Sequence, residues 1–364
     1  APTGVAAYLV DGSTIESALG IHQKSQRKKG YVGNNASMNS NLRFLYEDLI
    51  VIFLDEVSMV GCDKLARINF RMQEIMGNSK FMGGVSMVCT GDFGQLPPVM
   101  EKFIWEKSYI DGRLDMAPEH WNEFFKIYYL TEKMRSKDVE FSKMCDKVRQ
   151  GLCDADVMNY LNSHIRECPN RNNNEAFKWG KLSIIVSSND ERNKINLKKL
   201  NELLPDERKY EFISKDESTN KKKKHVSSNI DDLPLTKTGQ LESKLVIARG
   251  APVMITSNHQ QQRYKNNGIV NGSRGFVDSV QFSTDNPEVA EYVWVRFTDD
   301  NTGKLLREDN RGLLQHHRPH DPKAVPIKRQ KKQFEHAGSV LREQFPLTLC
   351  YALTAHKSQG ITCE

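Results

Sequence analysis

Two apolar runs that each end in polar residues constrain this chain more than any other feature. The first run, LIVIFL at 49–54, leads directly into the acidic pair Asp55-Glu56. The second run, VSMVCT at 85–90, leads into the pair Gly91-Asp92. Both runs have the length and β-branched character of buried strands. In open α/β sheets ligands bind beyond the carboxyl ends of the strands, so these pairs mark a candidate site.

A helical pattern joins the two runs. The segment DKLARINFRMQEIM at 63–76 carries apolar residues at roughly helical spacing. A strand, a helix and a strand over this length predict a parallel sheet. Further strands are predicted at 182–186 and 347–354, and further helices at 139–152 and 154–165. The predicted fold class is therefore α/β.

The acidic pair after the first run suits a site for a nucleotide and Mg²⁺. One carboxylate, Asp55, holds the hard cation, while the other, Glu56, orients or deprotonates an attacking water. The alternative is an exposed Asp-Glu pair at the start of a helix, where negative charge is favourable. Taken alone, the first run leaves both interpretations open.

The second run favours the nucleotide site. Its strand is followed by the amide Gln95 and the rigid pair Pro97-Pro98. A glutamine near the γ-phosphate distinguishes ATP from ADP and passes the difference to a neighbouring domain. The alternative, a strand followed by an ordinary proline turn, does not account for both segments together.

The second half of the chain has a different pattern. Residues 205–240 are rich in Lys, Asp, Ser and Asn without apolar periodicity, and predict a mobile surface insertion. From 250 to 345 short alternating segments, with turn residues at Asn271-Gly272 and 301–303, predict a small antiparallel β module.

Composition excludes some classes of protein. Hydrophobic residues make up 38% and charged residues 27%, which sets wholesale disorder aside. No apolar run approaches the roughly 20 residues of a membrane-spanning helix, and the N-terminal segment does not resemble a signal peptide. Seven irregularly spaced cysteines are typical of reduced intracellular thiols, and the net charge of +6 is compatible with a polyanionic partner.

The motifs of this sequence resemble those of the superfamily 1 DNA helicases of the petite-integration-frequency type, which include Helitron transposon helicases and are related to RecD-like enzymes. The resemblance spans nearly the whole chain, with the motifs in the family's order. They are APTGVAAYLVDGSTIESALG at 1–20, DEVSM at 55–59, FMGGVSMVCTGDFGQLPPV at 81–99, LTEKMRS at 130–136, ARGAPVMITSN at 248–258 with GIVNGSRGFV at 268–277, and PLTLCYALTAHKSQGIT at 346–362.

The resemblance implies two RecA-like motor domains, which we place at 1–131 and 132–364. A small SH3-like β module is expected inside the second domain at about 273–344. The implied activity is ATP-dependent 5′-to-3′ DNA unwinding, with ATP and Mg²⁺ as cofactors and single-stranded DNA and strand junctions as partners. A monomeric motor without a membrane partner is expected, in the nucleus or mitochondrion of a eukaryote.

The resemblance also assigns roles to individual residues. Asp55 matches the Mg²⁺-holding aspartate and Glu56 the residue that activates the water. Gln95 matches the glutamine that contacts the γ-phosphate, and Arg135 the arginine placed against that phosphate, where a planar cation stabilises developing charge. Gly360 lies nearest the nucleotide. The residues that match the grip on single-stranded DNA are Pro2, Thr3, Gly4, Thr354, His356, Lys357, Ser358 and Gln359.

The chain departs from the family pattern in several places. The phosphate-binding pattern G-x-x-x-x-G-K-[ST] does not occur in it, and the family's last motif is also lacking. We therefore expect a fragment that alone binds ATP poorly and hydrolyses it negligibly. Glu16 stands where histidine is common, and Ser136 where glutamine is usual. The competing hypotheses are a non-catalytic single-strand-binding remnant and a RecD-like nuclease subunit, for which no additional acidic cluster is present.

Two further features have simpler explanations. The histidines of HHRPH at 316–320 lack partner ligands at metal-binding spacing, so a solvated loop is favoured. The basic runs at 221–224 and 328–332 fit a solvated loop and a strand of the β module better than targeting signals. Trp294 alternates correctly for a β core, which is favoured over base stacking.

Overall fold

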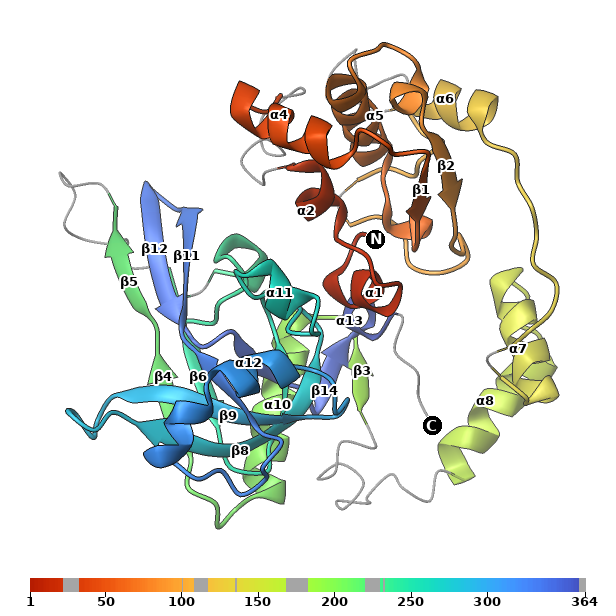
Figure 1. Cartoon of the computed structure of the whole chain (residues 1–364). Coiled ribbons are helices and arrows are strands. Elements are labelled where there is room, and N and C mark those ends of the chain that lie inside the picture. Colours follow the sequence, from red (N-terminus) through yellow and green to blue (C-terminus); the bar gives the residue numbers. More distant parts are fainter. Residues whose placement is uncertain are drawn as a thin grey trace. The chain divides into compact units, whose positions relative to one another are not determined.

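In the computed structural model the chain forms two compact units (Figure 1). Unit 1 comprises Ala1–Pro2 and Ser13–Asn173, and unit 2 comprises Thr3–Gly12 and Asn174–Glu364. The structure describes residues 1–21, 33–99, 101–107, 117–134, 136–167, 183–219, 230–231 and 233–359.

Unit 1 contains two parallel strands where the sequence predicts them, but they are only partly buried, since Phe53 is 73% exposed and Val88 43%. Strand β1 (Val51–Leu54) pairs with β2 (Ser86–Cys89) in the register Val51↔Ser86 to Leu54↔Cys89. Helix α5 (Cys62–Met76) connects them and buries the stripe predicted from its spacing. It ends at Gly77, whose φ of 69° is the left-handed conformation that favours glycine after a helix.

Short helices complete unit 1. They are α2 (Ile15–Leu19), α4 (Ala36–Leu45), η1 (Val57–Met59), η2 (Phe81–Gly84), α6 (Ala117–Phe124), α7 (Val139–Arg149) and α8 (Ala155–Glu167). The core gathers apolar side chains of α2, α5 and η2 around the end of β1. Helices α7 and α8 confirm the helices predicted at 139–152 and 154–165.

The largest sheet of unit 2 is antiparallel and has the order β10-β9-β8-β7-β13. Its strands are β7 (Pro252–Ile255), β8 (Arg274–Phe282), β9 (Ala290–Phe297), β10 (Val325–Lys328) and β13 (Leu347–Leu349). Trp294 on β9 is 1% exposed and its Nε1–H donates to Gln281 Oε1 at 3.0 Å, which confirms it as a core residue. The sheet includes β7 and β13, which lie outside the segment 273–344 predicted for the β module.

The described part of the segment 205–240 differs from the mobile insertion expected there. Strand β4 (Tyr210–Ile213) pairs with β6 (Lys244–Ile247), and β5 (Lys215–Ser218) pairs with β12 (Ser339–Gln344), which also pairs with β11 (Gln330–Glu335). Phe212 is buried, and the Asp216 carboxylate accepts hydrogen bonds at 2.7 and 2.8 Å from the buried Arg342 guanidinium. These long-range partners order strands that have no apolar periodicity of their own.

The run at 347–354, predicted as one strand, forms two strands in different sheets. Strand β13 pairs with β7, whereas β14 (Ala352–Thr354) pairs in parallel with β3 (Ile184–Val186). The change of partner occurs at Cys350 and Tyr351: the Cys350 N–H donates to Pro252 O, and Tyr351 O accepts from the Ile184 N–H. An apolar run alone does not reveal such a change of sheet.

Helices flank these sheets. They are α1 (Gly4–Leu9), α10 (Asn189–Leu203), η4 (Leu235–Lys237), α11 (Gln262–Lys265), α12 (Lys304–Asp309), η5 (Arg311–Gln315) and α13 (Ala355–Ser358). Helix α10 follows β3, and the Asn196 side chain bonds to the backbone of Ala352 at the start of β14. No described helix is both long and apolar enough to cross a bilayer.

The architecture confirms the α/β class. The compact units do not coincide with a boundary at residue 131, because α1 packs with unit 2 and residues 132–173 group with unit 1. The assignment of motor domains to 1–131 and 132–364, and the SH3-like description of the β module, stay predictions.

Candidate functional site

The carboxyl ends of β1 and β2 bring an acid and a hydroxyl together. Asp55 follows β1 and Thr90 follows β2, and the Thr90 hydroxyl donates to Asp55 Oδ1 at 2.7 Å. The Thr90 N–H also donates to Leu54 O at 2.9 Å, which extends the strand ladder to the site. Thr90 was not among the predicted site residues, although its place as the last residue of the second run was a signal for it.

Glu56 has an unusual backbone conformation. Its φ of 56° and ψ of 45° are left-handed, which costs a non-glycine residue roughly 1–2 kcal/mol. The next residue, Val57, donates its N–H to Thr90 O at 2.9 Å and thereby fixes the turn. Gly91 is required beside it, because a Cβ at that position would lie 2.8 Å from Val57 N. Strain of this kind concentrates at functional sites.

The loop after β2 is organised by Asp92. Its Oδ1 accepts a hydrogen bond from the Gly94 N–H at 2.9 Å and an ion pair from Arg149 of α7 at 2.6 Å. Burial opposes ionisation of Asp92, but these two partners outweigh it and hold its pKa below the ordinary value. Gln95 is exposed, and its side-chain Nε2 lies 3.5 Å from Asp92 Oδ2. Sequence reasoning missed Arg149, which lies far along the chain in a helix with no motif of its own.

The donor set at the end of β1 fits Mg²⁺. Carboxylate and hydroxyl oxygens are hard ligands, and only Oδ1 of Asp55 is engaged by a described hydrogen bond. Within the described ranges no group of three or more His, Cys, Asp or Glu side chains gathers into a metal site. Mg²⁺ is usually held by one or two carboxylates together with waters and nucleotide phosphates.

The second cluster of predicted residues lies in unit 2, around β14 and α1. Thr354 is the N-cap of α13, His356 is exposed, and the Ser358 hydroxyl donates to Ala355 O at 2.8 Å. Lys357 Nζ donates to Asn271 Oδ1 at 2.6 Å. Burial, reinforced by repulsion from the Arg192 guanidinium, lowers the pKa of Lys357 to about 8.

The remaining predicted residues are placed as follows. Thr3 caps α1 by accepting from the Ala6 N–H at 3.3 Å, and Gly4 is the buried first residue of that helix. Gln359 is half-buried after α13, and Pro2 belongs to unit 1. Arg135 and Gly360 lie outside the described residues. The roles predicted for all of these residues stay predictions.

The two residues that depart from the family pattern have local partners in unit 1. Glu16 Oε1 accepts an ion pair from Lys64 Nζ at 3.1 Å. The Ser136 hydroxyl accepts from the Asp138 N–H at 3.2 Å.

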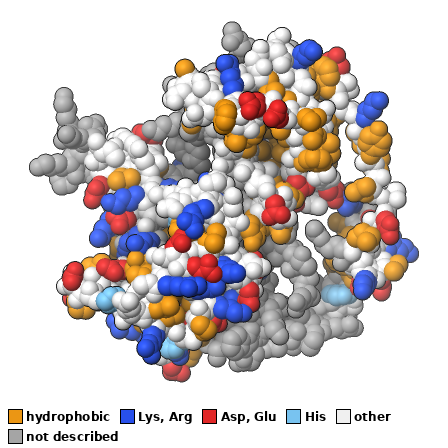
Figure 2. Space-filling view, in the orientation of Figure 1, with side chains coloured by type: hydrophobic (Ala, Val, Ile, Leu, Met, Phe, Trp, Pro, Cys, Tyr) orange, Lys and Arg blue, Asp and Glu red, His pale blue; other side chains and the backbone are white. Residues whose placement is uncertain are grey.

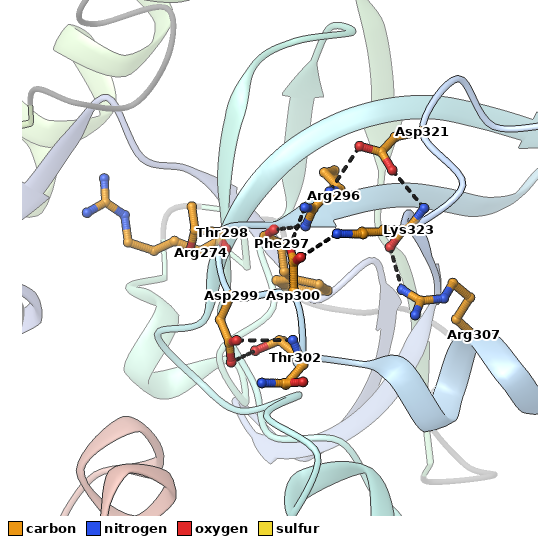
Figure 3. A network of polar contacts seen from close by, with 11 residues as sticks. Arg274, Arg296, Phe297, Thr298, Asp299, Asp300, Thr302, Arg307, Asp321 and Lys323 are labelled. Carbon is orange, nitrogen blue, oxygen red and sulfur yellow. Dashed lines mark hydrogen bonds and ion pairs between the residues drawn. The ribbon is translucent and has the colours of Figure 1, made fainter.

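A separate network of charges in unit 2 is balanced. Figure 3 shows Arg296, which pairs with Asp300 and with Asp321, and Lys323, which pairs with Asp300. Figure 2 shows Lys and Arg side chains beside Asp and Glu side chains in the region of α12. Cations neutralised in this way stabilise the loops after β9 and offer little charge to an external anion.

The HHRPH segment bonds to the same unit. His317 Nε2 lies 2.8 Å from the Ser279 hydroxyl, and its ring stacks on Trp294 at a centroid distance of 5.6 Å. The His320 ring lies against Arg249. These residues therefore have a structural role in joining the segment to β8 and β9.

Comparison with known proteins agrees with the motifs. Residues 1–159 match the model of the PIF1-like helicase family. The chain is similar to the ATP-dependent DNA helicase Pif1 of Campylobacter jejuni, with 25% identity over all of this chain and 74% of the relative. It spans only 49% of the Xenopus laevis ATP-dependent DNA helicase PIF1, at 24% identity.

Solved structures share the fold. The Pif1 helicase from Candida albicans has a TM-score of 0.69 at 23% identity, over 99% of this chain and 74% of that one. Bacteroides Pif1 bound to single-stranded DNA has a TM-score of 0.62 at 21% identity, over 99% and 73%. The family match over residues 1–159 and the likeness to Pif1 helicases over the whole chain agree with the resemblance seen in the motifs, and the solved structures show that the fold is shared.

Proposed function

We propose that this chain forms most of the motor of an ATP-dependent DNA helicase that moves 5′ to 3′ on single-stranded DNA. The proposal rests on the hydrogen-bonded carboxyl ends of β1 and β2. There the Thr90 hydroxyl donates to Asp55, and Glu56 adopts a left-handed conformation. The match of residues 1–159 to the PIF1-like helicase model supports the same activity, and similar proteins carry the name ATP-dependent DNA helicase.

In the proposed nucleotide site each residue has one task. Asp55 would hold Mg²⁺, with the Thr90 hydroxyl fixing its carboxylate, and the bound cation would supply charge stabilisation for the phosphates. Glu56 accepts the proton of the attacking water. Gln95 contacts the γ-phosphate from the loop that Asp92 organises. Arg135 and Gly360 keep their family roles against the phosphate and beside the nucleotide.

In the proposed DNA site the contacts are made to the backbone of the strand. Hydroxyls, an imidazole, amides and an ammonium suit phosphate oxygens and carry no base preference. The residues assigned to this task are Pro2, Thr3, Gly4, Thr354, His356, Lys357, Ser358 and Gln359. The antiparallel strands β8 to β10 belong to the proposed SH3-like module. A monomeric motor is proposed, acting on single strands and on junctions with duplex DNA.

The test compares the full-length protein with its Glu56→Gln variant. We expect single-strand-stimulated ATP turnover to fall by about 100-fold or more, because general base catalysis contributes 10²–10⁴-fold, while ATP binding is retained. Asp48→Asn, which alters an exposed acid ahead of β1, is the control and keeps normal turnover. A Glu56→Gln variant with normal turnover would sink the assignment. A wild-type protein that binds single strands without any turnover would favour the binding remnant.

A further inference from the structure

The Lys357 ammonium is held by a neutral partner. Its Nζ donates to the side-chain oxygen of Asn271 at 2.6 Å, and among the described residues no carboxylate lies within ion-pair distance of it. Lys323 in the same unit differs, because Asp300 pairs with its charge. An amide oxygen fixes the direction of an ammonium without cancelling its positive charge, and Lys357 keeps donors for an anion.

The turn that contains Asn271 is held by several hydrogen bonds. Its N–H donates to the side-chain Oδ1 of Asn258 at 2.7 Å. The next residue, Gly272, donates its N–H to Ile255 O at 2.8 Å, and the Ser273 hydroxyl donates to Gly268 O at 2.6 Å. The backbone of the turn that contains Asn271 is therefore tied to the end of β7 and to Asn258.

The same asparagines lie against the start of α1. A Cβ on Gly4 would lie 2.7 Å from Asn258 Oδ1 and 3.4 Å from Asn271 N. A Cβ on Gly272, whose φ is 105°, would lie 2.4 Å from Val5 Cγ2. Glycine at both positions lets the helix and the turn approach closely. Two segments predicted to grip the strand, at Thr3-Gly4 and at Lys357, thus share Asn258 and Asn271 as a common support.

We propose that Asn271 is a positioning residue that aims the Lys357 ammonium at a phosphate of the bound strand, with Asn258 holding Asn271 in place. The inference rests on the proposed DNA-binding function and deepens it. The Arg192 guanidinium of α10 acts on Lys357 as a like charge, so an anion bound beside Lys357 would stabilise its ammonium. A phosphate is the anion that a nucleic acid strand supplies at this position.

The experiment measures the affinity of the full-length protein for a labelled oligothymidylate by fluorescence anisotropy at several salt concentrations. Each phosphate contact on a single strand contributes about 0.7 to the slope of log K against log salt. We expect Lys357→Ala to lower the slope by about 0.7. Asn271→Ala lowers the slope in the same direction, and the double variant loses no more than Lys357→Ala alone.

The Asn271→Asp variant separates positioning from a merely structural role. It keeps an acceptor for Lys357 but neutralises the ammonium, so we expect weaker binding and a lower slope with an unchanged melting temperature. Asn286→Ala, which removes an exposed amide in the turn between β8 and β9, is the control and leaves the slope unchanged.

The outcomes distinguish this inference from the proposed function. No binding of the oligonucleotide by the wild-type protein would contradict the function itself. A normal slope in Lys357→Ala, with binding retained, would remove Lys357 from the DNA site. A lowered slope in Lys357→Ala together with normal binding in Asn271→Asp would overturn only the positioning role.

Discussion

Unit 1 and unit 2 each contain a parallel strand pair, and the two pairs end in opposite chemistry. Strand β1, paired with β2, ends in Asp55 and Glu56, whereas β14, paired with β3, leads into His356 and Lys357. Both pairs are parallel, so the difference lies in the charged side chains that follow each strand and in the group that holds each of them. A hydroxyl fixes the acid at β1, and an amide fixes the ammonium after β14. Both partners are neutral, and both leave the charge available to a ligand.

The largest effect is expected from removing the charge at β1. Asp55→Asn should lower single-strand-stimulated ATP turnover by about 100-fold or more, because Mg²⁺ contributes several kcal/mol of charge stabilisation. Steady-state turnover over a range of Mg²⁺ concentrations measures it. If Asp55→Asn and wild type have the same Mg²⁺ dependence, the acidic strand end has no part in cation binding.

A smaller effect is expected from removing the neutral partner of that acid. Thr90→Val deletes the hydrogen bond to Asp55 Oδ1, and loss of such an outer partner costs about 10-fold in metal affinity or activity. The Mg²⁺ concentration for half-maximal turnover should rise accordingly. Ser86→Ala, at an exposed position of β2, is the matched control. Equal Mg²⁺ dependence in Thr90→Val and Ser86→Ala would show that the hydroxyl does not support the site.

Lys357, which follows β14, predicts that the affinity for single-stranded DNA depends on pH. Lys357 has a pKa near 8 and is charged below it, so affinity for single-stranded DNA should fall as the pH rises through about 8. The fall should be up to about fivefold, which corresponds to the loss of one ion pair of about 1 kcal/mol. Lys357→Arg, which stays charged, should flatten the profile in anisotropy titrations. A wild-type profile that is already flat from pH 7 to about 9 would contradict the charge assignment.

The smallest expected effect is on the free energy of unfolding and concerns Tyr351, directly before β14. The Tyr351 hydroxyl is buried and has no hydrogen-bond partner among the described residues. Tyr351→Phe should therefore leave the free energy of unfolding unchanged or raise it by about 1 kcal/mol, since an unsatisfied polar group is removed. Thermal unfolding measures it, and clear destabilisation would reveal a partner for the hydroxyl.

The sequence predicts the local parts of this structure well. The strands β1 and β2, helix α5 and the acidic pair follow from short apolar runs and their spacing, because neighbours in sequence determine them. The residues that hold the site side chains in place cannot be predicted from local sequence patterns. Thr90, Arg149 and Asn271 reach their partners across 35, 57 and 86 positions of the chain, and no periodic pattern encodes such contacts.

Strand pairing over long distances also explains the remaining differences. Strand β5 is rich in charged residues. Its formation depends on the pairing of Asp216 with Arg342, which lies 126 positions later in the chain. The division of 347–354 depends on β7 and β3, which take adjacent parts of one apolar run into different sheets. Both outcomes are determined by tertiary contacts, which intrinsic β propensity does not predict.

The division at Cys350 and Tyr351 has a mechanical consequence. A pull on α13 along the axis of β14 loads the β14–β3 pairing in shear, where its hydrogen bonds resist together. Force that is transmitted through Tyr351 reaches β13, whose hydrogen bonds to β7 resist it. Two sheets of unit 2 therefore resist the pull one after the other. A strand end built in this way can bear tension at Lys357 without transferring it to a single loop.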